Sequence, residues 1–329
     1  MSDIDVLGIG NAIVDIIAKC DDKVLQDLDL PKGHMQLISS EDADRLYDAM
    51  GPAVEISGGS AANTCAGIGA FGGNTGFIGV VDDDQFGKVF AHDLNAIGVK
   101  FDTPFNEGTT PTARCLVFVT PDGERTMNTY LGACVELGPE EISEKQVQSA
   151  KITYLEGYLF DPPRAKEAFF KAAEIADKAG QRVALSLSDG FCVDRHRDDF
   201  LKFIKAHVDI LFANEDEIKA LYQTDDFSNA ADQVRHDVEL AALTQGAKGS
   251  MILHGNATMA APSIAVEAVV DTTGAGDLYA AGFLYGFTQG KNLDICGSLG
   301  AVAASEIISH IGARPEANLV DLAKENELL

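Results

Sequence analysis

Residues 271–283 read Asp-Thr-Thr-Gly-Ala-Gly-Asp-Leu-Tyr-Ala-Ala-Gly-Phe, the most specific stretch in the chain. We expect a strand over residues 264–270, a tight turn at the two glycines, and then a helix. A helix N-terminus favours anions because its first backbone N–H groups are unpaired. Asp277 stands in that first turn, and an anion site beside a carboxylate suits phosphoryl transfer to a hydroxyl. Taken alone, an acidic helix cap after a loop explains the stretch equally well.

The composition indicates a globular protein and argues against several classes of partner. The 329 residues are 46% hydrophobic and include 32 glycines, which fits one large α/β domain with an addition, or two domains. The formal net charge is −26, from 25 Lys and Arg against 51 Asp and Glu. Such a surface repels nucleic acid and anionic lipid, so we expect neither as a partner, although solubility alone also explains the charge.

The cysteines and the N-terminus favour a cytoplasmic protein. Six cysteines are scattered without a Cys-x-x-Cys pair, which is typical of reduced core thiols. An acidic start runs directly into a predicted strand, so we expect no signal peptide. No apolar run approaches the roughly 20 residues that span a bilayer.

The order of predicted elements indicates two sheets. After residue 150, strands alternate with helices, which predicts a parallel sheet covered on both faces. The earlier strands do not fit that pattern. We therefore predict a large nucleotide-binding and catalytic domain from residues 1–12, 58–100 and 132–329. A small lid would be built from two insertions, residues 13–57 and 101–131.

Two glycine patterns superficially suggest a dinucleotide site. In residues 8–13 the third small position is occupied by Ile13, which would crowd the contact between helix and strand. Residues 67–72 match Gly-x-Gly-x-x-Gly but lie in a helical run, where close helix packing explains them better.

Residues 57–63, Ser-Gly-Gly-Ser-Ala-Ala-Asn, suit close approach to a ligand. The two glycines let the backbone come near, and Ser60 and Asn63 face one side of the following helical turn. An ordinary helix cap by Ser60 explains the segment as well.

Two later segments follow predicted strands. Residues 214–217, Asn-Glu-Asp-Glu, either cap an acidic helix or place Asn214 and Glu217 to order water around magnesium. Residues 244–249, Thr-Gln-Gly-Ala-Lys-Gly, either let a nucleotide lie against the backbone or form a β-turn.

In this order, the segments resemble the signatures of the ribokinase, or PfkB, family of carbohydrate and nucleoside kinases. Residues 58–73 are similar to the first signature and residues 271–283 to the second, and the resemblance covers nearly the whole chain. It implies a doubly wound, mostly parallel α/β sheet flanked by helices (ribokinase-like), with a small β-sheet lid. It also implies ATP as the phosphoryl donor and Mg²⁺ as a required ion.

The resemblance assigns the chemistry to the second signature. Asp277 would be the general base for the acceptor hydroxyl, and the N–H groups of Gly274, Ala275 and Gly276 would stabilise the transferring phosphoryl group. An isolated aspartate, with a pKa near ~3.9, is a weak base. That suffices, because in a loose transition state the proton leaves late and positioning dominates.

The resemblance also implies an ATP and metal side. Asn214 and Glu217 match an element linked to magnesium and phosphate, with Glu217 acting on Mg²⁺ through water. Thr244, Gly246 and Gly249 match a nucleotide loop.

Three more residues complete this side. Asp271 and Thr273 resemble a segment that lines a potassium site in relatives. Arg125, in the lid, would meet the phosphates of ATP, meet the carboxylate of a sugar acid, or face solvent.

Within the family, the chain most resembles adenosine kinases. Residues 8–15 are similar to their opening segment, which implies that Asp15 accepts hydrogen bonds from the ribose diol. The other implied acceptor-pocket residues are Gln36, Gly58, Gly59, Ser60, Asn63 and Tyr158.

The acceptor is therefore expected to be adenosine, phosphorylated on its 5′-hydroxyl to give AMP and ADP. Ser60 replaces the lysine of ribokinases, which counts against free ribose, whereas Ala12, Ala61 and Ala62 depart from the adenosine-kinase pattern. The alternatives are a kinase of a sugar or sugar acid (ribose, fructose or 2-keto-3-deoxygluconate type) and a catalytically silent ligand-binding relative. We expect a monomer or homodimer.

Overall fold

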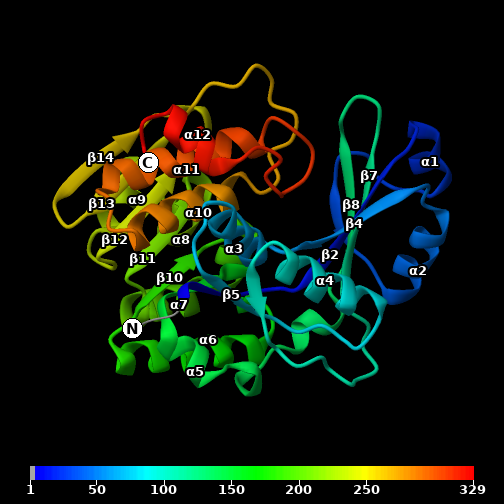
Figure 1. Cartoon of the computed structure of the whole chain (residues 1–329), viewed down its shortest axis with the longest axis horizontal. Helices are drawn as coiled ribbons and strands as arrows, with labels where there is room; N and C mark the ends of the chain where they lie inside the picture. Colours follow the sequence, from blue (N-terminus) through cyan, green and yellow to red (C-terminus); the bar gives the residue numbers. More distant parts are fainter. Residues whose placement is uncertain (1–3) are drawn as a thin grey trace.

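Two sheets organise the computed structural model, which describes residues 4–329, and the small sheet stands beside the large one (Figure 1). The large sheet runs β14-β13-β12-β11-β10-β9-β1-β5-β6. Its strands pair in parallel except at β12–β13 and β13–β14. Its strands are β1 (Ile4–Ile9), β5 (Thr75–Ile78), β6 (Val99–Phe101), β9 (Ala150–Glu156), β10 (Arg182–Ser186), β11 (Ile210–Asn214), β12 (Leu240–Thr244), β13 (Ser250–His254) and β14 (Ala257–Ala261). The predicted mostly parallel sheet is confirmed.

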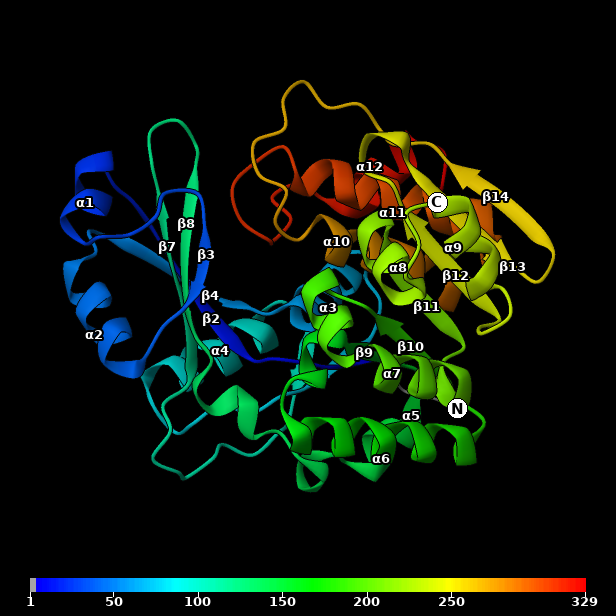
Figure 2. The ribbon, with the colours of Figure 1, turned by 180° about the vertical axis from the view of Figure 1, so that it is seen from behind.

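Helices cover both faces of the large sheet (Figures 1 and 2). One face carries α3 (Ser60–Ala70), α4 (Gln85–Ala96), α10 (Ala275–Thr288), α11 (Leu293–Ile307) and α12 (Leu319–Glu325). The other carries α5 (Glu144–Ser149), α6 (Pro163–Ala179), α7 (Gly190–His207), α8 (Glu215–Tyr222) and α9 (Phe227–Val234). Short 3-10 turns are η1 (Gly132–Glu136), η2 (Pro139–Glu141), η3 (Gly157–Phe160) and η4 (Gly246–Lys248). Because both faces are covered, the central strands are buried along nearly their whole length rather than at alternate residues.

Small residues bring α3, α10 and α11 unusually close together. A Cβ on Gly67 of α3 would lie 2.6 Å from the Cβ of Ala281 in α10, and a Cβ on Gly282 of α10 would overlap the Leu299 carbonyl oxygen of α11. The glycine pattern of residues 67–72 is thus in helical packing, as its context indicates. This packing fixes α10, whose first turn carries Asp277.

The small sheet has the order β3-β8-β7-β2-β4 and holds the early strands of the sequence. Its strands are β2 (Ile13–Lys19), β3 (Met35–Leu37), β4 (Ala53–Gly58), β7 (Ala113–Val119) and β8 (Arg125–Tyr130). The helices α1 (Asp22–Asp27) and α2 (Ser40–Ala49) cover one face, and the other face turns toward the large sheet (Figure 2). The division into domains at residues 13–57 and 101–131 stays a prediction.

The strand expected over residues 264–270 is wrong, because this segment forms an irregular loop (the gold loop in Figure 1). Its β-branched residues suggested a strand, but Pro262 interrupts the chain directly after β14. The loop then crosses from the edge strand to α10, and Val269 remains 61% exposed. The second signature therefore follows a loop rather than a strand.

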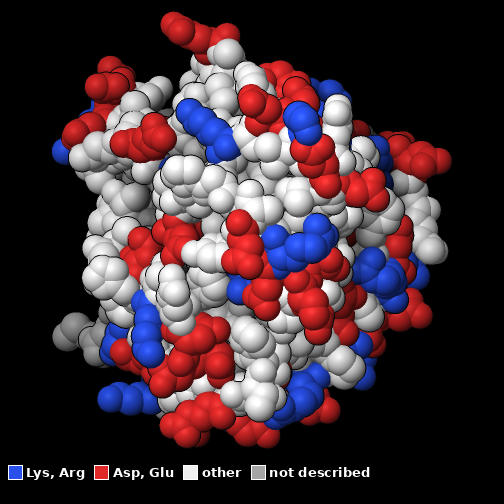
Figure 3. Space-filling view, turned by 90° about the vertical axis from the view of Figure 1, so that its right-hand side faces the viewer, with Lys and Arg blue, Asp and Glu red and all other residues white. Residues whose placement is uncertain are grey.

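The surface is acidic and carries mixed charges. Figure 3 views the small-sheet side, where acidic side chains are spread among fewer basic ones. Lys32, for example, pairs with both Asp22 and Asp122 at 2.6 Å. Among residues 4–329, no helix has the length and apolar character needed to cross a membrane.

Candidate active site

A cavity of about 400 Å³ opens at the carboxyl ends of the central parallel strands. β1 lies between β5 and β9. Along the chain the strands are therefore added first on one side of β1 and then on the other. Such a reversal of strand order leaves a crevice at the carboxyl ends of the strands. The walls come from both sheets and from the N-termini of α3 and α10, and include Asp15, Ser60, Asn63, Glu217, Gly274 and Asp277.

Asp277 is held on both carboxylate oxygens by the first turn of α3. Ser60 Oγ donates to Oδ1 at 2.6 Å, and Asn63 Nδ2 donates to Oδ2 at 3.0 Å. Burial raises the pKa of Asp277, whereas these two hydrogen bonds and the charge of Arg314 act in the opposite direction. Asp277 is thus a fixed carboxylate in a cavity, in the geometry that a general base requires.

The N-terminus of α10 leaves backbone donors for an anion. Within residues 4–329, the N–H groups of Gly274, Gly276 and Asp277 have no hydrogen-bond partner. The N–H of Ala275, by contrast, donates to the Thr272 carbonyl at 3.2 Å. Gly274 has φ +77°, a left-handed conformation that favours glycine. Two of the three predicted donors, Gly274 and Gly276, are therefore free, and the N–H of Asp277 is free in place of that of Ala275.

Asp15 reaches the same cavity from β2 of the small sheet. Its carboxylate has no hydrogen-bond partner among the described residues. Burial raises its pKa to about 6, although Arg125 and Arg314 lower it. A Cβ on Gly58 would lie 2.5 Å from Asp15 Oδ2, so the glycine leaves room for this carboxylate. Asp15 is available to accept hydrogen bonds from a ligand.

Of the other residues expected at the acceptor side, some line the cavity and some do not. Gly59 and Tyr158 line the cavity, and Tyr158 is 39% exposed. Gln36 does not line it, because its side chain lies on the opposite face of the small sheet and donates to Asn128 Oδ1 at 2.7 Å. Phe160, two residues further along the same 3-10 turn, is buried in the core.

Asn214 and Glu217 form a reciprocal helix cap at the edge of the cavity. Glu217 N–H donates to Asn214 Oδ1 at 2.8 Å, and Asn214 N–H donates back to Glu217 Oε2 at 2.9 Å. Burial raises the pKa of Glu217 to about 7. Both side chains line the cavity, so the capping explanation and a role near phosphate are compatible. Among residues 4–329, no cluster of three His, Cys, Asp or Glu side chains forms a ready metal site.

A second cavity, of about 630 Å³, adjoins the first. The two share residues at the start of α10, among them Thr272, Ala275 and Gly276. Its walls include Thr244, Gly246 and Gly249, as expected for a nucleotide side. Apolar side chains dominate the rest of its lining, from the loop before α10 and from α11. The shape therefore offers two binding spaces that meet at the N–H groups of α10.

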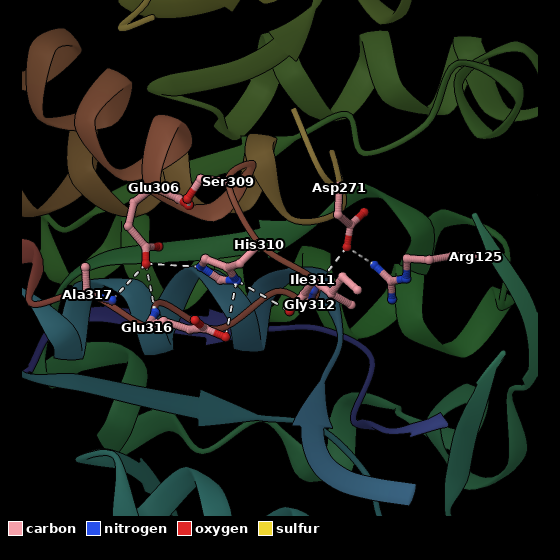
Figure 4. A network of polar contacts seen from close by, with 9 residues as sticks. All are labelled: Arg125, Asp271, Glu306, Ser309, His310, Ile311, Gly312, Glu316 and Ala317. Carbon is pink, nitrogen blue, oxygen red and sulfur yellow. Dashed lines mark hydrogen bonds and ion pairs between the residues drawn. The ribbon is translucent and has the colours of Figure 1, made fainter. Parts of the chain in front are cut away.

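Arg125 and Asp271 form an ion pair between the two sheets (Figure 4). Both side chains are buried, at 8% and 6% exposure. Asp271 also accepts from the N–H groups of Thr273 and Gly312, each at 3.0 Å. Both of its oxygens are therefore engaged within the protein. Arg125, expected to meet ATP or a sugar acid or to face solvent, is buried in this pair and is not in the lining of either cavity.

Two residues near the site have no role in the sequence interpretation. Glu156 is 1% exposed at the carboxyl end of β9 and accepts from Asn11 Nδ2 at 2.7 Å and Ala61 N–H at 2.9 Å. Its position after a predicted strand is a signal that sequence reasoning overlooked. Arg314 contacts Asn63 and Ser57, and no sequence pattern marks it.

The chain resembles known kinases over its whole length. The model of the pfkB family carbohydrate kinases matches residues 35–318. A probable sugar kinase from Rhizobium etli is 51% identical with a TM-score of 0.92, each chain covering 100% of the other. An adenosine kinase from Sinorhizobium meliloti is 52% identical with a TM-score of 0.90, over 98% of this chain and 99% of that one.

A more distant relative acts on a different acceptor by name. An ATP-dependent ribose-1-phosphate kinase from Halopiger xanaduensis is 31% identical over 78% of this chain and 83% of its own length. The fold, the motif order and these matches together lead to one conclusion: the chain belongs to the PfkB family of carbohydrate kinases, which transfer a phosphoryl group to an alcohol.

Proposed function

We propose that this kinase transfers the γ-phosphoryl group of ATP to the 5′-hydroxyl of adenosine, giving AMP and ADP in purine salvage. The proposal rests mainly on Asp15, a half-buried carboxylate that lines the acceptor side of the cavity and has no hydrogen-bond partner among residues 4–329. A vicinal diol offers two O–H donors to such a group. A carboxylate that is largely removed from water without a partner is costly, which favours a ligand that pairs with it.

The opposing side chains support an acceptor with an apolar part. On β3, Met35 and Leu37 are 60% and 63% exposed and pair in register with Met127 and Thr129 of β8. Residues directly opposite in a sheet point to the same face, and Met127 and Thr129 line the cavity. The small sheet thus presents an apolar surface beside Asp15, which suits a nucleobase better than the hydroxyls of a free sugar.

The reacting groups would then act as follows. The acceptor hydroxyl lies against Asp277, which takes its proton, and the free N–H groups at the start of α10 stabilise the charge on the moving phosphoryl group. Adenosine would occupy the cavity at Asp15, and ATP the larger adjoining one. Proton transfer to Asp277 needs no movement of its side chain, since Ser60 and Asn63 already hold the carboxylate.

Magnesium, which the family implies, would be held at Glu217 and Asn214 through its water molecules. Glu217 and Asn214 line the cavity and offer oxygen atoms, the ligand type that Mg²⁺ prefers. When bound, the ion would neutralise charge on the β- and γ-phosphates. The roles of Thr244, Gly246 and Gly249 at ATP, and of Asp271 and Thr273 at potassium, stay proposals.

A sugar or sugar acid is the second candidate, because relatives include kinases of such acceptors. The pairing of Arg125 with Asp271 counts against a sugar acid, since this guanidinium is already neutralised by a carboxylate. Asp15 would bind the diol of a free sugar as well, so the apolar strand β3 is the feature that separates the two candidates.

An ADP-release assay across acceptors tests the proposal. Purified protein with ATP and Mg²⁺ is given adenosine, guanosine, ribose, fructose or a 2-keto-3-deoxy sugar acid, and Asp277→Asn serves as the control for contaminating kinases. We expect saturable turnover on adenosine, with AMP identified by chromatography. Saturable turnover on a sugar and none on adenosine would overturn the choice of acceptor while leaving the kinase assignment intact.

A further inference from the structure

Arg314 lies behind the proposed base rather than in the cavity. It stands in the segment after α11, and its guanidinium reaches back to the start of α3. Nη1 donates to Asn63 Oδ1, and Nη2 donates to the Ser57 carbonyl at 2.6 Å and the Ser57 hydroxyl at 2.9 Å. The cavity lining includes Asn63 and Asp277 but not Arg314. Any influence on the reaction must therefore pass through Asn63 or through its charge.

The contact with Asn63 determines which way that amide points. A guanidinium has donors only, so the amide atom that faces Arg314 must be the oxygen. The amide nitrogen is then directed at Asp277 Oδ2, which it meets at 3.0 Å. With the amide reversed, an oxygen would face the Asp277 carboxylate and a donor would face the guanidinium, and both contacts would be repulsive. Arg314 thus fixes a donor on Asp277.

The segment that carries Arg314 is itself firmly attached (Figure 4). The buried Glu306 accepts the N–H groups of Glu316 and Ala317, each at 2.8 Å, and His310 Nε2 lies 3.1 Å from the same oxygen. Gly312 N–H donates to Asp271. Anchors on both sides of residue 314 hold its backbone, so the guanidinium is presented at a defined place.

From these contacts we propose that Arg314 is a positioning residue for Asp277, fixing the Asn63 amide and holding the base as an oriented carboxylate. The proposal rests on the proposed role of Asp277. Burial favours the protonated form of Asp277, and the charge of Asp277 in turn raises the pKa of Asp15, Glu156 and Glu217. Arg314 is the cation that couples to Asp277, and it lowers the pKa that burial raises.

Steady-state kinetics of Arg314→Gln and Arg314→Lys test the proposal, on whichever acceptor the wild type phosphorylates. For Arg314→Gln we expect kcat to fall about 10- to 100-fold, as misplaced reacting groups cost. The KM for ATP should stay within about threefold, because the residue is remote from the second cavity. The acid limb of the pH–kcat profile should move to higher pH, since the base then ionises less readily. Arg314→Lys should restore the position of the acid limb but not the full kcat. Lysine keeps the positive charge but lacks the planar guanidinium that contacts Asn63 and Ser57 together.

A double variant separates positioning from general loss of structure. If Arg314 acts through Asn63, adding Arg314→Gln to Asn63→Ala should lower kcat by less than about threefold more. Arg314→Ala should also regain activity with added guanidinium. Arg182→Gln, which removes an exposed ion pair with Glu239 at 2.8 Å, is the matched control and should keep wild-type kcat.

Two results would overturn the inference. One is an unchanged acid limb in Arg314→Gln. The other is a double variant in which the two losses of kcat multiply in full. If Arg314→Gln folds poorly, the guanidinium rescue of Arg314→Ala and the kinetics of Arg314→Lys test the inference instead. These outcomes are distinct from failure of the proposed function, which would appear as wild-type protein that does not phosphorylate adenosine or as Asp277→Asn that keeps its turnover.

Discussion

Two half-buried carboxylates face one cavity, and their surroundings differ sharply. Asp277, on the large-sheet side, is held by Ser60 and Asn63. Asp15, on the small sheet, has no protein partner within the described residues. The group proposed as the base is thus fixed before any ligand arrives, whereas the group proposed to recognise the acceptor is left for the acceptor to satisfy.

The largest effect should come from Asp277→Asn, which keeps the shape and removes the base. We expect kcat to fall about 1,000-fold, within the usual range for a general base, with the KM for both substrates little changed. Initial rates with ATP and the acceptor measure it. Wild-type turnover in this variant would assign the base elsewhere and remove the contrast.

Asp15→Asn should act on binding instead. Loss of two charge-assisted hydrogen bonds should raise the KM for the acceptor about 10- to 100-fold, at about 1.4 kcal/mol per factor of ten. The KM for ATP should not move. Leu37→Ala, on the same face of the small sheet, makes a useful comparison because it trims the apolar surface without touching the carboxylate. An unchanged acceptor KM in Asp15→Asn contradicts the role in the diol contact.

Acceptor affinity in the wild type should depend on pH. The pKa of Asp15 is raised to about 6, so the carboxylate is ionised above that pH and protonated below it. Protonation removes an acceptor, so we expect acceptor affinity to weaken up to about tenfold per pH unit below 6. Titration of acceptor binding from pH 5 to pH 8 measures this, with Asp15→Asn as the control that should show a flatter curve.

The smallest effect concerns stability. A carboxyl group whose pKa is raised on folding favours the folded state at low pH, and this contribution is lost as the pH rises from about 4 through about 6. Asp15→Asn should therefore unfold less readily at pH 8 by on the order of 1 kcal/mol, and by less at pH 5. Urea unfolding at both values tests it, and a destabilised variant at pH 8 would argue that Asp15 has hidden partners.

The sequence predicts well which side chains meet at the start of α10, for a physical reason. Ser60 and Asp277 each follow a glycine at the start of a helix, and Asn63 stands one turn after Ser60, so these positions are recognisable in the chain order. Their convergence across 217 residues follows once the strands are arranged in a parallel sheet. The two-sheet organisation is similarly predictable, because the early strands do not follow the regular alternation of strands and helices that begins after residue 150.

Other features depend on strand register and on contacts between distant segments, which no local sequence pattern encodes. Gln36 lies on the face of the small sheet away from the cavity, because pairing of the three-residue β3 with β8 sets which side each residue faces. Residues 264–270 look like a strand by composition, yet they form a loop that lines the second cavity. Arg314 is an isolated arginine in sequence, and its importance depends on which segments fold against it.

The close packing of α3, α10 and α11 has a consequence for divergence within the family. Where backbones touch through glycine, as at Gly67 and Gly282, no side chain can be enlarged without pushing the helices apart. Mutation therefore has little freedom at the reacting end and much more on the small sheet, whose exposed strand β3 makes few such contacts. A lineage could exchange one acceptor for another by altering that sheet while its phosphate-transfer machinery stays where it is.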